Sequence, residues 1–152
     1  MKRMILAVTA LSVAGLCFAA DPAEGFWAAP PEKGGEAQAV WEFYQNNGIL
    51  YGTLVSGAGL TVYDKAVNCK EGYRDFPIAG KVYQLPVLGT PWIFGLRSES
   101  PARWNNGYVI NPADGTVYKC KITYHPAEAL EVRGEIGLGV GGSRYWKRLT
   151  QE

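Results

Sequence analysis

The sequence predicts an all-β protein, a single antiparallel up-and-down β-barrel of about eight strands. Short segments in which apolar and polar residues alternate recur along the chain, as expected for strands with one face in a core. Turn sequences rich in Gly, Pro and Asn separate them. After residue 20 there is no convincing amphipathic helix pattern. Because sequential hairpins can close into a barrel and remove exposed edges, a barrel is favoured.

The first 20 residues are typical of a secretory signal. Lys2 and Arg3 precede an apolar run that is short for a membrane span, and small residues follow it. Cleavage is expected after Ala19 or Ala20, which leaves residues 21–152 as one domain. A lipoprotein signal with Cys17 lipidated is the alternative, which Leu16 disfavours. No later stretch predicts a transmembrane segment, so we expect a periplasmic or secreted protein.

The first half of the mature chain contains one clear hairpin. Residues 36–45 alternate, and Asn46-Asn47-Gly48 then supplies residues that accept positive φ. Residues 49–56 form the return strand, and residues 59–63 are a further short strand. Residues 64–75 predict a long loop. Candidate strands follow at 81–88 and 92–96, although Pro86 and Pro91 limit their regularity.

The second half begins with a second predicted loop, residues 97–106. Strands are expected at 107–111, 116–124, 129–136 and 143–149, joined by turns at 112–115, 125–128 and 137–142. In the strand over 129–136, Leu130, Val132 and Ile136 are expected to face inward.

The two ends of the mature chain predict how the barrel closes. Gly25 and Trp27 belong to the first strand, and Trp146 and Arg148 to the last. An up-and-down barrel places these strands side by side, so the Arg148 guanidinium can stack on the Trp27 indole. We expect this contact at the closed end, opposite any ligand entrance.

The chain resembles an uncharacterised family of small secreted bacterial proteins with a lipocalin-like (calycin) barrel. Four matches carry the resemblance: residues 21–27; Leu50-Tyr51-Gly52; Asn111-Pro112 with Gly115, Tyr118 and Cys120; and Val132-Arg133-Gly134 with Trp146 and Arg148. The resemblance implies a barrel able to hold a small apolar ligand, and it supplies no established reaction.

Aromatic residues are the most informative set for function. They either line a ligand cavity or fill the small barrel with side chains, and the sequence leaves both outcomes open. The candidate ligand-binding residues of the interior are Trp41, Phe43, Leu54, Tyr118, Ile122 and Tyr124.

Catalytic and cofactor motifs do not withstand inspection. The glycines at 137, 139 and 142 match a dinucleotide fingerprint, but a strand follows them where that motif needs a helix. His125 is the only histidine, so neither a metal site nor a Ser–His–Asp triad is predicted, and no cofactor is expected. An enzyme is the least favoured class.

Cys69 and Cys120 remain after signal cleavage. An oxidising compartment permits a disulfide between them, and two unpaired thiols are the equal alternative.

Charge excludes some partners. The mature chain has 13 basic and 14 acidic residues, a net charge of about −1 without a basic cluster, which does not fit a nucleic-acid binder.

The leading hypothesis is a non-catalytic binding protein for a small apolar or amphipathic ligand. The alternative is a structural or protein-interaction module of the cell envelope with a filled barrel. The sequence does not give the oligomeric state.

Overall fold

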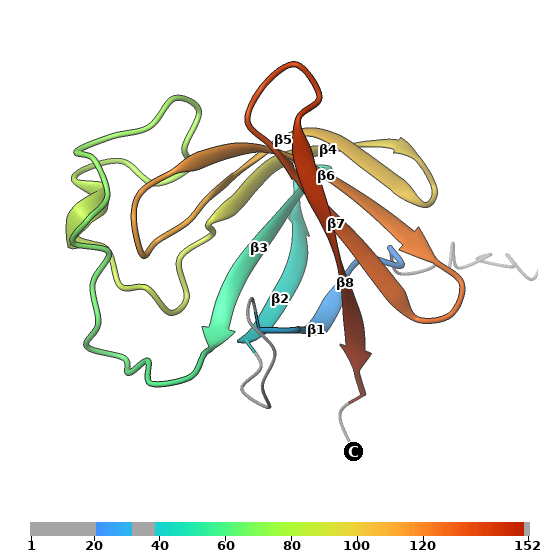
Figure 1. The fold of residues 1–152 in the computed structure, drawn as a ribbon, viewed down its shortest axis with the longest axis horizontal. Coiled ribbons are helices and arrows are strands. Elements are labelled where there is room, and N and C mark those ends of the chain that lie inside the picture. Colours follow the sequence, from blue (N-terminus) through green and yellow to red (C-terminus); the bar gives the residue numbers. More distant parts are fainter. Residues whose placement is uncertain (1–20, 32–38, 151–152) are drawn as a thin grey trace, which may run out of the picture.

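The computed structural model describes residues 21–31 and 39–150, and the predicted signal at 1–20 lies outside them. Eight antiparallel strands form a closed barrel in sequential order, which confirms the predicted fold class (Figure 1). The strands are β1 (Gly25–Ala29), β2 (Ala39–Asn46), β3 (Ile49–Ser56), β4 (Ile93–Ser100), β5 (Arg103–Ile110), β6 (Val117–His125), β7 (Ala129–Glu135) and β8 (Gly141–Leu149). Among the described residues, no helix is long and apolar enough to cross a membrane.

A tight turn between β2 and β3 and the pairing of the first and last strands make this topology possible. Asn47 and Gly48 both have positive φ, 51° and 75°, so the β2–β3 turn has the twist that a two-residue hairpin requires. β1 pairs with β2 on one side and with β8 on the other, and Trp27 lies opposite both Trp41 and Arg148. The β1–β8 ladder closes the barrel and leaves no strand edge between the first and last strands.

Three predicted segments are wrong. Residues 59–63 form turns, because the Asp64 carboxylate accepts hydrogen bonds from the Thr61 backbone and hydroxyl. Residues 81–88 contain a 3₁₀ turn, η1 (Val82–Gln84), whose apolar residues pack against the barrel without joining its sheet. The predicted loop over 97–106 belongs mainly to β4 and β5, since its polar residues face solvent along a ladder that includes the Arg97–Asn105 pair.

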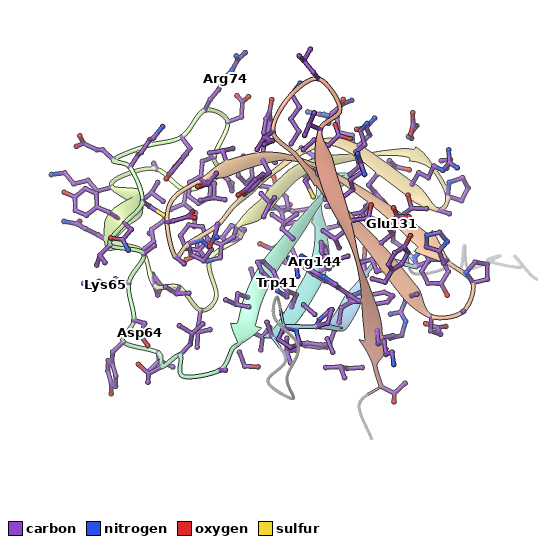
Figure 2. The ribbon with its side chains drawn as sticks, in the orientation of Figure 1. Trp41, Asp64, Lys65, Arg74, Glu131 and Arg144 are labelled. Atoms are coloured by element: carbon purple, nitrogen blue, oxygen red, sulfur yellow. The ribbon has the colours of Figure 1, made fainter. Side chains whose placement is uncertain are left out.

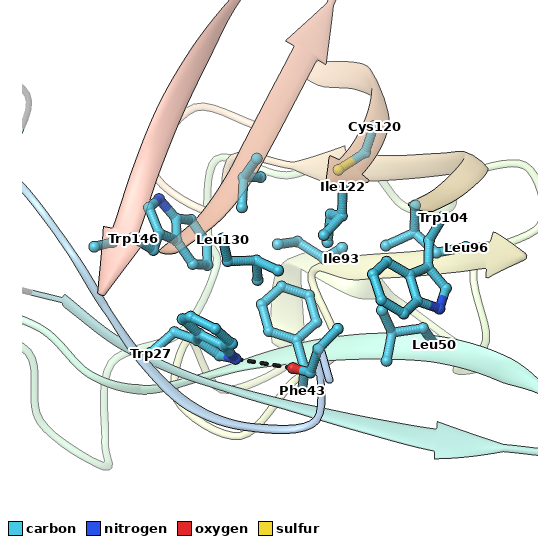
Figure 3. Packing of buried hydrophobic residues seen from close by; sticks show 13 residues of the cluster. Trp27, Phe43, Leu50, Ile93, Leu96, Trp104, Cys120, Ile122, Leu130 and Trp146 are labelled. Atoms are coloured by element: carbon cyan, nitrogen blue, oxygen red, sulfur yellow. Dashed lines mark hydrogen bonds between the residues drawn. The ribbon is translucent and has the colours of Figure 1, made fainter. Parts of the chain in front are cut away.

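Large side chains pack the barrel lumen (Figure 3). Trp27, Phe43 and Ile122 are at most 1% exposed. The buried members of this cluster are Ala23, Trp27, Ala29, Phe43, Leu50, Ile93, Leu96, Trp104, Cys120, Ile122, Leu130, Val132 and Trp146. Burial of these apolar side chains supplies the main driving force for folding of the barrel.

A second cluster lies under the long segment between β3 and β4, which is drawn green to yellow at the left of Figure 1. Its buried residues are Leu54, Ala66, Cys69, Val82, Val87, Trp92, Phe94 and Ile110. The indole of Trp92 donates to the Val87 carbonyl, and the Tyr73 hydroxyl donates to the Gly115 carbonyl in the β5–β6 turn. The segment is therefore an ordered cover on one side of the barrel.

Candidate ligand-binding cavity

A cavity of about 650 Å³ opens at the end of the barrel where β5 and β7 end and β6 and β8 begin. Trp41 and Arg144 both line it, and Figure 2 labels them close together beside β8. The lining residues are Trp41, Val109, Ile110, Asn111, Pro112, Tyr118, Val132, Gly134, Gly142, Ser143 and Arg144. This volume and the mixed aromatic and aliphatic wall fall within the range of small-molecule sites.

The β7–β8 ladder sets which residues of these strands face the cavity. Leu130 pairs with Trp146, Val132 with Arg144, and Gly134 with Gly142. Directly paired residues share a face of the sheet, so Arg144 and Gly142 lie on the same inner face as the buried Val132. The alternation of β8 therefore directs Arg144 toward the lumen.

Glycine leaves room at this end of the barrel. A Cβ atom built on Gly142 would meet no heavy atom within 4 Å. Opposite it, Gly134 would place a Cβ 3.5 Å from Tyr118, an ordinary contact. The missing side chains of this cross-strand pair thus contribute directly to the cavity volume.

The other end of the barrel is closed by residues 21–24. Ala23 is fully buried, and its carbonyl accepts a 2.8 Å hydrogen bond from the Trp27 indole. Arg148 Cζ lies 4.3 Å from the centre of the Trp27 ring, so the structure contains the contact that the sequence predicts.

Gly25 has φ 112°, and a Cβ there would lie 3.2 Å from Arg148 Nη1. Glycine is required because a side chain would be strained and would crowd the guanidinium.

The side chain of Arg148 forms hydrogen bonds to several parts of the closed end. Nη1 donates to the Glu24 carbonyl at 2.9 Å, and Nη2 donates to the carbonyl of Pro22. Nε donates to the Glu128 carboxylate at the β6–β7 turn. The guanidinium thus joins residues 22–24, the first strand and the β6–β7 turn.

The six predicted ligand-binding residues are distributed over several places. Trp41 and Tyr118 line the cavity. Phe43 and Ile122 do not, because they fill the lumen at 1% exposure each. Leu54 lines a separate pocket of about 250 Å³ beneath the β3–β4 segment.

Tyr124 lies at the closed end, where its ring makes an edge contact with Trp27 at 6.4 Å between centroids. Strand alternation predicts that Tyr124 faces inward. Its position along β6, however, decides at which end of the barrel its side chain lies. Ile136 is also misassigned, because it is 67% exposed in the β7–β8 turn.

The possible disulfide is not present. Cys69 and Cys120 are both free and buried, Cys69 in the cluster beneath the β3–β4 segment and Cys120 in the lumen. Burial raises the pKa of Cys120 to about 12, which keeps this thiol protonated and unreactive. The alternative of two unpaired thiols, with Cys120 as a small buried apolar residue, therefore describes the structure.

A polar cluster on the outer wall contains the residue types of a Ser–His–acid catalytic triad. In this cluster, however, the acid lies between the serine and the histidine. Ser143 Oγ donates to Glu131 Oε1 at 2.7 Å, and Glu131 Oε2 lies 3.0 Å from His125 Nε2. The carboxylate occupies the central position that a base such as histidine needs, and its hydrogen bonds to Ser143 and His125 lower its pKa. No described group of three or more His, Cys, Asp or Glu could hold a metal.

Nine of the eleven residues that line the cavity were not among the predicted ligand-binding residues, and Arg144 is one of them. Alternation is the available signal, because the period of two that separates Trp146 from Arg148 also places Arg144 on their face of the strand. The β7–β8 register places Arg144 opposite Val132 at the open end, where its side chain is exposed.

These features define the class of protein: a lipocalin-like barrel with one closed end and a cavity of mixed apolar and polar lining at the other. A solved structure of the protein HP1028 from Helicobacter pylori, described as belonging to the lipocalin family, has a similar fold. The TM-score is 0.70 at 19% identity, over 85% of this chain and 84% of that one. The chain belongs to a family of uncharacterised proteins conserved in bacteria (DUF2147), which matches residues 25–148. Comparison with curated proteins gives no match.

Proposed function

We propose that this protein is a non-catalytic binding protein, periplasmic or secreted, for a small apolar or amphipathic molecule. The observation that carries the proposal is the cavity of about 650 Å³ with Trp41, Val109 and Tyr118 in its wall. An apolar molecule that enters it exchanges water for aromatic and aliphatic surface, which is favourable in proportion to the area buried.

A variant that fills the cavity tests this function. Gly142→Phe places a ring where a Cβ meets no neighbour, so the protein should fold with nearly unchanged stability and lose binding of dodecanol. Gly142→Ala is the matched control, since one methyl group removes little volume. Binding is measured by isothermal titration calorimetry below the micellar concentration. If the unmodified protein binds no alkyl probe, or if Gly142→Phe binds as well as the unmodified protein, the proposal fails.

The periplasmic or secreted location rests on the sequence of residues 1–20. Expression of the full chain followed by fractionation and N-terminal sequencing tests it. The proposal requires a mature chain that starts at Ala20 or Asp21 outside the cytoplasm. A lipidated Cys17 would instead support the lipoprotein alternative.

A second candidate function is protein interaction in the cell envelope. Its support is a set of exposed apolar side chains on the β3–β4 segment, including Val62 at 70%, Tyr63 at 87% and Val67 at 69%. Crosslinking in intact cells tests it, with a Val62→Ser/Tyr63→Ser variant for comparison. Loss of one defined crosslink in that variant, together with no ligand binding by the unmodified protein, would favour this function.

A further inference from the structure

The turn between β7 and β8 carries three exposed aliphatic side chains. Ile136 is 67% exposed, Val140 is 63% exposed and Leu138 is fully exposed. The turn projects beyond the barrel at the top of Figure 1, and we call residues 136–140 the apolar tip. Exposed apolar side chains gathered at one place and bordered by polar residues mark an interaction surface.

Hydrogen bonds hold the apolar tip in its conformation. The backbone N–H of Ile136 donates to the Val140 carbonyl at 2.9 Å, and the N–H of Val140 donates to the Gly137 carbonyl. From β7, Arg133 Nη2 donates to the Gly139 carbonyl at 3.0 Å. An ordered turn therefore presents the aliphatic side chains to solvent.

Basic side chains lie at the base of the apolar tip. Lys119 pairs with Glu135, the last residue of β7, and Lys121 pairs with Arg133. Glu135 is the one carboxylate in these two cross-strand pairs, and it contacts Arg133 at 2.8 Å and Lys121 at 3.5 Å. Three cations thus stand beside one anion, so the field at this position favours negatively charged groups.

A polar pocket of about 330 Å³ adjoins the same lysines. Lys119 and Lys121 line it together with Asn105 and Asn106 of β5. Ammonium and amide groups are hydrogen-bond donors that suit phosphate oxygens. A cationic polar pocket next to an aliphatic tip matches the two parts of an anionic phospholipid, its headgroup and its chains.

The size of the apolar tip favours a bilayer over a protein partner. A stable protein interface takes about 20–30 residues from each side, whereas the tip offers three apolar side chains on one turn. A narrow tip can instead insert among lipid headgroups, where its aliphatic side chains leave water and nearby lysines meet anionic phosphates.

The apolar tip also continues from the rim of the cavity. Gly134 and Gly142 line the cavity and pair with each other, and the tip lies between them in the chain. A protein held at a bilayer by this tip thus keeps its cavity rim near the lipid.

We propose that the apolar tip docks this protein onto the surface of a bilayer that contains anionic phospholipids. The three aliphatic side chains insert between headgroups, and Lys119 and Lys121 bind the phosphates of anionic lipids. Docking does not require a ligand in the cavity, so this inference goes beyond the proposed binding function.

Flotation of the full mature protein with lipid vesicles tests docking. Vesicles of phosphatidylcholine alone are compared with vesicles that also contain about 30% phosphatidylglycerol. We expect about tenfold tighter binding to the anionic vesicles, and this preference should weaken as NaCl is added, because salt screens the charges. Equal binding to both compositions, or no binding to either, would overturn the proposal.

Substitution in the apolar tip should remove docking and leave the barrel folded, because the replaced side chains are exposed. In Leu138→Ser/Val140→Ser, affinity for the anionic vesicles should fall about tenfold. Val62→Ser/Tyr63→Ser is the matched control, since it replaces two equally exposed apolar residues of the β3–β4 segment. The control should bind like the unmodified protein, and equal losses in both variants would contradict docking through the tip.

The lysines at the base of the tip should supply the preference for anionic lipid. In Lys119→Gln/Lys121→Gln, affinity for the anionic vesicles should fall about tenfold, toward that for neutral vesicles. Lys65→Gln/Lys70→Gln, at exposed positions of the β3–β4 segment, should keep the preference. If the two variants behave alike, overall charge causes the attraction and the role given to Lys119 and Lys121 is wrong.

The outcomes separate docking from ligand binding and from a protein partner. Vesicle binding without dodecanol binding would leave docking in place while the proposed function fails, and dodecanol binding without vesicle binding would do the reverse. If the unmodified protein binds no vesicles and Leu138→Ser/Val140→Ser loses one defined crosslink in intact cells, the tip binds a protein and bilayer docking is overturned.

Discussion

The two ends of the barrel use the same residue types for opposite purposes. Arg144 and Arg148 lie on one face of β8, with Trp146 between them. At the closed end, Arg148 stacks on Trp27 and holds the carbonyls of residues 22 and 24. At the open end, Arg144 and Trp41 line a cavity.

The difference follows from the neighbours of each arginine. At the closed end, the backbone of residues 21–24 crosses the lumen and presents carbonyl acceptors, and Phe43 and Trp27 fill the space. At the open end, Gly134 and Gly142 face each other across the β7–β8 ladder and leave the space open. The backbone acceptors therefore give Arg148 a structural role, whereas Arg144 borders a cavity.

Trp41 connects the two ends. It stacks on Trp146 with ring centroids 5.4 Å apart, and it pairs with Trp27 across the β1–β2 ladder. It also packs against both buried clusters and lines the cavity. The packed half of the lumen thus provides a rigid wall for the open half.

The largest effect is expected from truncation of a tryptophan at the closed end. Trp27→Ala removes a fully buried ring and its hydrogen bond to Ala23, so we expect the free energy of unfolding to fall by about 4 kcal/mol. Trp41→Ala, at the cavity wall, should cost no more than about half as much, because this ring is only partly buried and its loss removes less apolar area from the core. Urea denaturation followed by circular dichroism measures both. Equal losses would show that the two ends are not packed differently.

The two arginines of β8 provide a closer comparison. Arg148→Ala should lower the free energy of unfolding by about 2 kcal/mol, because it removes the stacking on Trp27 and leaves part-buried carbonyls without a donor. Arg144→Ala should change it by less than about 0.5 kcal/mol, as expected for an exposed position. The same denaturation experiment, combined with dodecanol titration, should show stability lost in one variant and retained in the other. If Arg148→Ala kept full stability and lost ligand binding, the orientation of the barrel given above would be wrong.

The smallest effect is expected on the outer wall, away from both ends. Hydrogen bonds from Ser143 and His125 hold the pKa of Glu131 below its ordinary value of 4.5. A carboxyl group with a lowered pKa in the folded state stabilises the fold above its unfolded pKa, and this contribution is lost as pH falls through the folded pKa. Glu131→Gln should therefore cost about 0.5 kcal/mol at pH 7 and almost nothing well below pH 4.

Denaturation at a series of pH values measures this difference between the two proteins. Glu99→Gln, on an exposed stretch of β4, is the control and should show no such pH dependence. A Glu131→Gln effect that persisted unchanged at low pH would assign the loss to packing instead of charge.

Much of the barrel was predictable because its signals are local. Alternation placed β2, β3, β6 and β7, and Asn47-Gly48 placed a hairpin turn, since strand faces and positive φ depend on neighbouring residues. The Trp27–Arg148 contact was also within reach, because a sequential barrel has to bring its first and last strands together.

Local signals failed in two regions where packing or strand pairing overrides the residue pattern. Val82 and Val87 belong to an apolar run that reads as a strand, but they pack onto Trp92 and Phe94 beneath a cover segment. Conversely, residues 97–100 and 103–106 look like a polar loop, yet pairing between β4 and β5 makes them strand. In the first region packing against the barrel decided the structure, and in the second strand pairing did.

The sequence by itself determined an all-β chain, its strand faces and the residues able to close a barrel, because each depends on a short period or on the order of strands. The tertiary structure alone decided which inner-face residues pack together and which surround a cavity. Phe43 and Trp41 share a face of β2, yet one fills the lumen and the other lines the open space. The physical reason is that cavity volume depends on the side chains that meet across the barrel, where the cross-strand glycines Gly134 and Gly142 leave room for a ligand beside Arg144.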